Sequence, residues 1–356
     1  MVDNVQESIK SLIAERNGVN IAEFISLANH LTAKAYYKNA LTIGTQGDFV
    51  TSSEISQIFG EIIAIWILDI WQNKFCKSKI QILELGPGSG NLMADILRVT
   101  KNLADFHANI EIYLLDINES LIKQQTQKLV NFIPSIKWVT SIEEIPSNPT
   151  IIIANEFFDV FGVRQFIKKK YKWYEICVQI NSENDLQQEE KECFDLDIIK
   201  ELDLHINIEE GGIIELNIDS TAFLQLLLKR FTNVAGAIID YGYCISPNLR
   251  TKNQYNATIQ ALKDHKYVDV YKNFAVADIT THVDFYALQK LILSRNLKSY
   301  YYTQKTFLKN YGIDIRLNML KNLNPLCAKA LDKEVEYLTS DKYMGDMFKV
   351  LTFCKE

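Results

Sequence analysis

The stretch Ile80-Gln81-Ile82-Leu83-Glu84-Leu85-Gly86-Pro87-Gly88-Ser89-Gly90 decides the fold of this chain. Its apolar beginning predicts a buried strand, and its three glycines predict a turn that opens into a helix over 91–101. Glycine has no Cβ, so the backbone there can adopt positive φ angles and lie against a ligand. A helix that begins after such a turn presents free backbone N–H groups. The stretch therefore predicts a ligand-binding turn, although a tight strand-to-helix turn without a ligand has the same pattern.

Strands and helices alternate after this turn. We expect strands over 80–85, 110–116, 136–139 and 150–154, and helices over 91–101 and 118–130. This order predicts a parallel sheet with helices on both faces. A late strand over 348–353 fits a mostly parallel, seven-stranded sheet with one antiparallel strand. The predicted fold class is α/β, with a helical N-terminal region and a β-rich insertion.

The chain divides into four expected parts. Residues 1–75 form a helical N-terminal cap, with a helix over 21–37, a loop rich in glycine and threonine over 41–50, and a long helix from Thr51 to about Gln72. Residues 76–162 form the first half of the core. Residues 163–231 are an insertion, with a hairpin over 165–180 and a polar surface loop over 181–200. Residues 232–356 form the second half of the core.

Composition excludes several classes of protein. Hydrophobic residues make up 47% and charged residues 23%, which is typical of globular chains. The net charge of −6 argues against a nucleic-acid partner, which needs a basic face. The apolar stretch 62–71 is too short to span a membrane. Six scattered cysteines without a C-x-x-C pair predict reduced thiols and no metal site, and the first residues do not form a signal peptide.

Glycine spacing distinguishes between cofactors. Dinucleotide folds show G-x-G-x-x-G, whereas the third glycine here comes one residue early, at Gly90. An acid before the first glycine, Glu84, and another at the end of the next strand, Asp116, are instead typical of class I S-adenosylmethionine (SAM) methyltransferases, which have a Rossmann-like fold. Asp116 can accept hydrogen bonds from both ribose hydroxyls, and Glu84 can hold polar groups near the sulfonium. Asp116 as a simple helix cap remains an alternative.

A second acidic segment, Asn155, Glu156 and Asp159, follows the buried strand 150–154. Ligands of open α/β sheets bind at the carboxyl ends of the strands. Glu156 and Asp159 are three residues apart, so they share a face in a helical turn. Two carboxylates suit a guanidinium, and they can localise its charge on one nitrogen and leave lone-pair density on the attacking one. Alternatively, Asn155 and Glu156 cap a helix and Asp159 is solvated.

Weaker predictions concern the substrate side. Asp240 and Tyr241 end another buried strand, over 236–241. His282 lies within the segment 278–285 and is one of only five histidines in the chain. A hydrogen-bonded structural role is an equal alternative for His282.

These motifs together resemble the MidA family of SAM methyltransferases, which is related to the mitochondrial complex I assembly methyltransferase. The resemblance rests on residues 47–61, 84–90, 155–160, 163–166, 239–242 and 278–285, and on the closing strand. It implies a SAM-dependent protein arginine N-methyltransferase that acts on a subunit of respiratory complex I or its bacterial counterpart. Two positions depart from the family pattern: Asp116 stands where we expect Glu, and Ser53 stands where Pro often precedes the acid.

The resemblance also implies roles for single residues. The cofactor would contact Gly86, Gly88 and Gly90, and a loop with Asp48 and Thr51 would close over it. The substrate side would include Asn155, Glu156 and Asp159 as catalytic residues and, as a weaker prediction, Arg164.

The expected partner is a protein substrate, with no nucleic acid, no metal and no membrane span; the oligomeric state is left open. The expected compartment is the bacterial cytoplasm, or the mitochondrial matrix for a processed eukaryotic form. Three alternatives remain: a non-catalytic assembly factor with the same fold, a methyltransferase for another protein or a small molecule, and a nicotinamide-dependent oxidoreductase. The glycine spacing disfavours the oxidoreductase.

Overall fold

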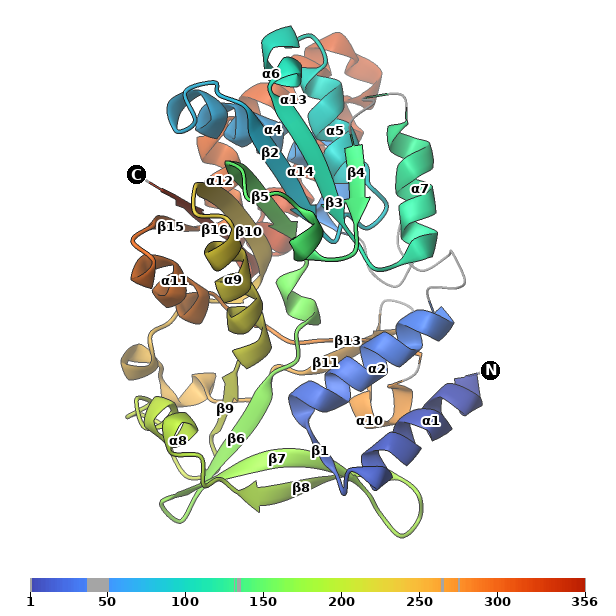
Figure 1. Cartoon of the computed structure of the whole chain (residues 1–356), viewed down its shortest axis with the longest axis vertical. Helices are drawn as coiled ribbons and strands as arrows, with labels where there is room; N and C mark the ends of the chain where they lie inside the picture. The colour runs from blue at the N-terminus through green and yellow to red at the C-terminus, as the bar shows by residue number, and fades with distance from the viewer. Residues whose placement is uncertain are drawn as a thin grey trace. The chain divides into compact units, whose positions relative to one another are not determined.

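The structure, a computed structural model, describes residues 2–36, 51–130, 132, 136–263, 266–274 and 276–355 (Figure 1). Contacts divide the chain into two compact units, each discontinuous in sequence. Unit 1 consists of Met1–Asn39, Asp159–Phe223 and Tyr243–Leu288, and unit 2 of Ala40–Phe158, Leu224–Gly242 and Gln289–Glu356. The four-part division expected from the sequence concerns roles along the chain, and it stays a prediction.

The main sheet carries the glycine turn. Its strands follow the order β15 (Lys298–Thr303), β16 (Phe348–Cys354), β10 (Val234–Tyr243), β5 (Thr150–Asn155), β2 (Ile80–Leu85), β3 (Ile110–Leu115) and β4 (Ile136–Val139). Along this path β16 is antiparallel to both neighbours, and β10, β5, β2, β3 and β4 are parallel. The short strand β14 (Val283–Asp284) pairs with β10 off this path, so the sheet has eight strands rather than the seven expected.

Helices cover the main sheet because their apolar stripes match its apolar faces. One continuous core joins the sheet to α4 (Gln57–Asn73), α5 (Asn91–Thr100), α12 (Gln304–Asn310), α13 (Ile313–Leu323) and α14 (Ala328–Thr339). Further helices are α6 (Ala104–Ala108), α7 (Glu119–Leu129), α9 (Ile218–Arg230), α11 (Phe285–Ser294) and α15 (Met344–Met347), with 3₁₀ turns at Ile142–Glu144 and Pro325–Cys327. No helix in the described part of the chain is long and apolar enough to cross a membrane.

The long helix expected from Thr51 to Gln72 is interrupted. The structure has a short helix α3 (Ser52–Ile55), then Ser56 in an extended conformation (φ −153°), and then α4. The Ser56 side chain accepts a hydrogen bond from the Ile58 backbone N–H and so caps the second helix. The prediction of one continuous helix was wrong because a serine at this position ends one helix and begins the next.

Unit 1 contains two smaller sheets. In the first, β1 (Val19–Asn20), β7 (Lys172–Ile180), β6 (Arg164–Lys169) and β9 (Ile213–Leu216) lie in that order, and β8 (Leu186–Glu192) also pairs with β7. In the second, β11 (Gln260–Lys263) lies between β12 (Lys266–Val268) and β13 (Asp278–Thr280). The helices of this unit are α1 (Val2–Glu15), α2 (Ile21–Tyr36), α8 (Leu196–Leu202) and α10 (Val270–Asn273), with 3₁₀ turns at Phe158–Val160, Pro247–Leu249 and Lys252–Gln254.

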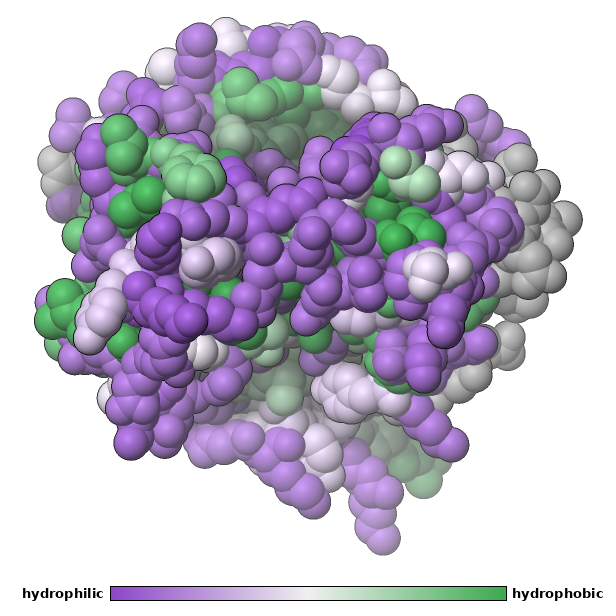
Figure 2. Space-filling model, turned by 90° about the horizontal axis from the view of Figure 1, so that it is seen from below, coloured by the Kyte–Doolittle hydropathy of each residue, from purple (hydrophilic) through white to green (hydrophobic). Residues whose placement is uncertain are grey.

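The polar segment 181–200, expected as a surface loop, is largely regular. It contains β8 and the start of α8, whose N-cap Asp195 accepts from two backbone N–H groups. Cross-strand pairs between lysine and glutamate, such as Lys172–Glu192 at 2.7 Å, stabilise β8, in which Leu186 is the single apolar residue. The face shown in Figure 2 is mostly hydrophilic, with separate hydrophobic patches. Low hydrophobicity concealed this strand from the sequence analysis.

Candidate functional site

The glycine turn lies between β2 and α5, as predicted. Gly86, Gly88 and Gly90 have φ angles of 60°, 54° and 77°, which favour glycine. A Cβ on Gly86 would lie 2.8 Å from Cδ2 of Phe157, so a side chain there would also displace that ring. Gly90 is the N-cap of α5. The turn therefore needs its glycines for backbone conformation and packing, apart from any ligand.

Glu84 is a buried carboxyl group at the end of β2. Its side chain is 2% exposed, and Oε2 has no hydrogen-bond partner among the described residues. Burial, and secondly the neighbouring charge of Asp116, raise the pKa of Glu84 to about 8. A buried acceptor without a donor is costly, which makes this oxygen a candidate contact for a ligand that supplies N–H or O–H groups.

Asp116 lies directly after β3 and is held by its own chain. Its Oδ1 accepts from the Asn118 backbone N–H at 2.9 Å, and its Oδ2 accepts from Nε2 of Gln125 at 2.8 Å. Each carboxylate oxygen has a second lone pair, so the predicted bonds to ribose hydroxyls remain a prediction. Burial raises the pKa of Asp116, and the bonds from Asn118 and Gln125 oppose that effect.

Gln125 is a site residue that the sequence analysis missed. Its side chain is fully buried, and besides the bond to Asp116 it donates to the Gly88 carbonyl at 2.9 Å and accepts from the indole of Trp138. It therefore joins the glycine turn to the acid after β3. The available signal was weak: one polar residue on the inner face of an otherwise amphipathic helix.

The acidic segment after β5 is strained at Glu156. This residue has a φ of 50°, in the left-handed region that is uncommon outside glycine. Its backbone N–H donates to the Ile239 carbonyl, and its Oε1 accepts from the Ser52 backbone N–H at 2.8 Å. Asn155 donates to the same oxygen at 3.4 Å, and Oδ1 of Asn155 is buried without a partner in the described chain. Strained residues of this kind cluster at functional sites.

The expected helical turn through Glu156 and Asp159 is absent, because Glu156 has left-handed backbone and the 3₁₀ turn begins at Phe158. Asp159, within that turn, is buried. Asp240 lies within β10, which continues to Tyr243 rather than ending at Tyr241 as expected. It accepts from the Phe158 backbone N–H at 2.9 Å and from the Tyr241 N–H. Asp240 thus fixes the backbone that follows Glu156.

Two other predicted site residues, Arg164 and Tyr241, make contacts typical of structural residues. Arg164 forms a two-bond ion pair with Glu175, at 2.6 and 2.7 Å, and lies over the ring of Phe166. Tyr241 is buried in the core of the main sheet and contacts the ring of Phe348 edge-on. Their predicted roles on the substrate side gain no support from these contacts and stay predictions.

Helix α3 also reaches the glycine turn. Thr51 is its N-cap residue, and the Thr51 side chain bonds that of Ser53. Glu54 Oε1 accepts from the Ser89 hydroxyl at 3.2 Å. Asp48 and the rest of the predicted closing loop before Thr51 lie outside the described residues. The sequence analysis placed Glu54 only within the long helix expected from Thr51, so it did not predict this contact.

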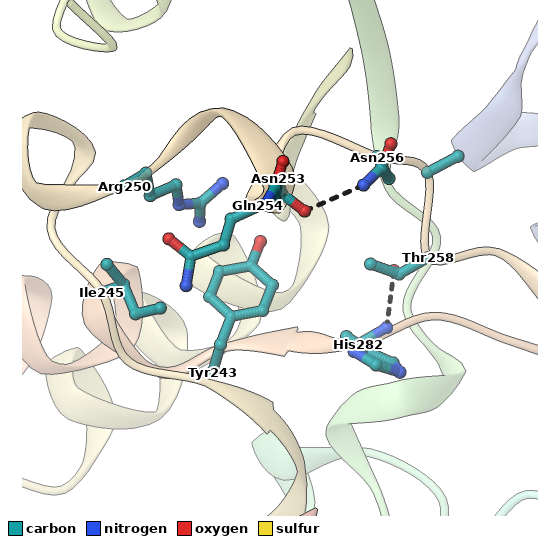
Figure 3. Close-up of a pocket in the computed structure, with 9 residues that line it drawn as sticks. Tyr243, Ile245, Arg250, Asn253, Gln254, Asn256, Thr258 and His282 are labelled. Atoms are coloured by element: carbon teal, nitrogen blue, oxygen red, sulfur yellow. Dashed lines mark hydrogen bonds between the residues drawn. The ribbon is translucent and has the colours of Figure 1, made fainter. Parts of the chain in front are cut away.

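His282 lies in a separate pocket within unit 1. This pocket has a volume of about 230 Å³ (Figure 3). In Figure 3 the side chains of Arg250, Gln254 and Tyr243 lie next to one another on one side, and Thr258 and His282 on the other. The Arg250 guanidinium, buried over the Tyr243 ring, pairs with Asp284 at 3.1 Å.

Around His282 the hydrogen bonds form a chain. Its backbone N–H donates to Thr258 Oγ1 at 2.9 Å, and that hydroxyl donates to Glu215. Glu215 is buried and also accepts from Gln165, and burial raises its pKa. Burial lowers the pKa of His282, which favours the neutral imidazole. The sequence predicted His282 but gave no signal for Glu215 or Arg250.

Residues 62–303 match the family described as "Putative S-adenosyl-L-methionine-dependent methyltransferase". The chain belongs to this family. The methyltransferase is also 31% identical to a rat protein named "Protein arginine methyltransferase NDUFAF7, mitochondrial", over 93% of this chain and 79% of the relative. The zebrafish protein of the same name is 30% identical, over 97% of this chain and 86% of the relative. The family predicted from the motifs is confirmed.

A crystal structure confirms the fold of the methyltransferase. This protein from Burkholderia thailandensis, bound to S-adenosyl-homocysteine, superposes with a TM-score of 0.88 at 22% identity, over 99% of this chain and 92% of that one. The α/β fold of a SAM methyltransferase, with a mixed sheet and helices, is therefore established, and SAM is the cofactor.

The residues around the turn fit SAM. Buried acceptors without partners in the described chain occur on Glu84, Asn155 and Glu54, and the cofactor carries an ammonium group and ribose hydroxyls that can donate. Gly86, Gly88, Gly90 and Asp116 would line the same edge of the sheet. When bound, SAM supplies an electrophilic methyl group; the chain supplies the positions of the donors and acceptors around it.

Proposed function

We propose that this methyltransferase modifies arginine side chains of a protein, and that the substrate is a subunit of respiratory complex I or its bacterial counterpart. The curated relatives named above are protein arginine methyltransferases, which supports this substrate class. The observation that carries the proposal is Glu156, a strained carboxylate at the carboxyl end of β5 whose Oε1 is fixed by the Ser52 N–H.

The chemistry fits a guanidinium substrate. A carboxylate binds the planar guanidinium by charge-assisted hydrogen bonds and holds the positive charge on the nitrogens that it contacts. The remaining nitrogen then keeps more lone-pair density and can take the methyl group that the cofactor would supply. The electron pair of the sulfur–carbon bond would stay on sulfur, which gives S-adenosylhomocysteine, and the methylated nitrogen would release its proton to solvent. Glu156 and, further along the chain, Asp159 are the proposed carboxylates, with Asn155 holding Glu156. The rate acceleration comes mainly from positioning the substrate nitrogen next to the methyl group.

Finer points of the proposal rest on the sequence. We propose a class I arrangement of the main sheet, with β16 as its antiparallel strand. His282 and its pocket are proposed to contact the protein substrate, and a cytoplasmic or mitochondrial matrix location remains a prediction.

The decisive experiment is mass spectrometry of complex I subunits incubated with SAM and the purified protein. We expect arginine methylation with the wild type, and an at least ~100-fold slower reaction with Glu156→Gln, because the amide keeps the shape and loses the charge. SAM affinity should be retained. The control is Glu183→Gln, an exposed glutamate in unit 1.

Two results would contradict the proposal. Equal methylation by Glu156→Gln and wild type would assign Glu156 to the backbone of the turn alone. Binding of SAM without methylation of any arginine, in any subunit tested, would favour the non-catalytic assembly factor.

A further inference from the structure

Glu54 keeps one carboxylate oxygen unsatisfied beside the glycine turn. Ser89, within the turn, donates to Oε1 at 3.2 Å, whereas Oε2 is buried and has no hydrogen-bond partner among the described residues. The basic side chain whose charge acts on Glu54 is Lys128, and its ammonium donates instead to Asn91. The oxygen is therefore an acceptor next to the cofactor turn with nothing in the described chain to fill it.

An acceptor left in this state has an energetic cost. A buried polar group without a partner destabilises a fold by about 1–3 kcal/mol, and a charged one by more. Native structures keep few such groups, and those that persist call for a partner outside the chain. SAM offers one, because its amino-acid end carries an ammonium group with three N–H donors.

We propose that Glu54 binds the ammonium group of the cofactor's amino-acid end. The inference rests on the SAM assignment and goes beyond it, because it adds a cofactor contact from helix α3, outside the glycine turn. Ser89 fixes Oε1 and so directs the carboxylate toward the turn. The same short helix donates the Ser52 N–H to Glu156, so α3 contacts both the cofactor turn and the proposed substrate carboxylate.

A capping role is the simpler explanation for Glu54. It is the third residue of α3 after the N-cap Thr51, where a glutamate can accept from the N-cap backbone N–H. In the structure the Thr51 side chain makes no cap hydrogen bond, but the Thr51 backbone N–H does bond the Glu54 carboxylate. This capping contact leaves Oε2 without a partner among the described residues. Glutamine serves in a capping box as well as glutamate does, so Glu54→Gln preserves the cap and the bond from Ser89 and removes only the charge.

The test is calorimetric titration of the full-length protein with two ligands. S-adenosylhomocysteine contains the amino-acid end, and 5′-methylthioadenosine lacks it. For Glu54→Gln we expect about ten-fold or greater loss of affinity for S-adenosylhomocysteine, since hydrogen bonds to charged groups are the strong ones. Affinity for 5′-methylthioadenosine and the unfolding temperature should match the wild type. Glu119→Gln, an exposed glutamate in the first turn of α7, should bind both ligands normally.

Three outcomes would overturn the inference. Unchanged affinity of Glu54→Gln for both ligands would show that the charge does not contact the cofactor. Equal loss for both ligands would show that Glu54 only supports the shape of the turn. If the wild type binds neither ligand, the assignment of the cofactor site itself fails, and the inference fails with it.

Discussion

At the scale of single residues, Glu84 combines a cost in stability with a proposed role in binding. Its pKa is raised from 4.5 to about 8 by burial first and by Asp116 second. As the pH rises between these values, the unfolded chain loses the Glu84 proton while the folded chain keeps it. The free energy of unfolding therefore falls over this range. Binding of a cationic ligand offsets this loss of stability, because the ligand stabilises the ionised carboxylate.

We therefore expect Glu84→Gln to stabilise the ligand-free protein. The gain should be small at about pH 5 and should grow to about 1 kcal/mol or more at about pH 8, because only the wild type resists losing the Glu84 proton in the folded state. Urea unfolding at the two pH values measures the difference. An equal gain in the free energy of unfolding at both pH values would show that Glu84 does not titrate as its burial implies. The same variant should bind SAM more weakly.

At the scale of elements, one cluster of charged side chains joins three helices, α4, α5 and α13. Glu61 of α4 is 1% exposed and pairs with Arg98 of α5 at 2.8 Å and with Arg316 of α13 at 2.5 Å. Burial acts to raise the pKa of Glu61, but the hydrogen bonds from Arg316 and Arg98 outweigh it and leave the pKa below its usual value. The cluster stabilises the fold fully at pH values above the pKa that Glu61 has in the unfolded chain. This stabilisation is lost as the pH falls through the lower pKa of Glu61 in the folded chain.

Removing Glu61 should leave two guanidinium groups without their shared partner. We expect Glu61→Gln to lower the free energy of unfolding by about 3 kcal/mol, the usual effect of breaking a buried pair. Lys200→Gln, which removes an exposed pair with Asp197, should change it by less than about 0.5 kcal/mol. Chemical denaturation of both variants measures the contrast. Equal effects would mean that the Glu61 cluster is no stronger than a surface pair.

At this scale the regular elements of the core were predictable and the polar ones were not. The strands β2, β3, β4 and β5 are apolar runs bounded by turn residues, so hydrophobic patterning located them. The strand β8 has almost no apolar residues, and its stability comes from pairing with β7. The break at Ser56 depends on one capping bond, which no periodic pattern reveals.

At the scale of the whole molecule, ligand binding should raise stability in a ligand-specific way. A ligand that binds only the folded state adds RT ln(1 + [L]/Kd), or about 2.7 kcal/mol at 100 Kd. We expect thermal unfolding to shift upward with SAM and with S-adenosylhomocysteine and to stay unchanged with NAD. A shift with NAD alone would return the chain to the oxidoreductase alternative, which the glycine spacing disfavours.

The candidate site was predicted where it depends on spacing. Gly86, Gly88 and Gly90 stand at fixed intervals after a strand, and their positive φ angles are the reason that other residues are excluded. Glu84 lies at the carboxyl end of β2, and Asp116 and Glu156 directly follow β3 and β5; these parallel strands end at one edge of the sheet. The spacing of residues could not show that Asp116 already accepts a hydrogen bond from Gln125. Nor could it show that the backbone of Glu156 adopts a left-handed rather than a helical conformation.

The sequence by itself determined the family, the cofactor and the succession of core strands along the chain, because glycine conformation and hydrophobic periodicity are local properties of the chain. The tertiary structure alone decided which polar side chains meet. Glu54 reaches Ser89 across 35 positions, and Ser52 reaches Glu156 across 104. Such contacts depend on how distant segments pack, and burial then sets their protonation. The glycine turn could therefore be located from local pattern, while its partners could be found only in the fold.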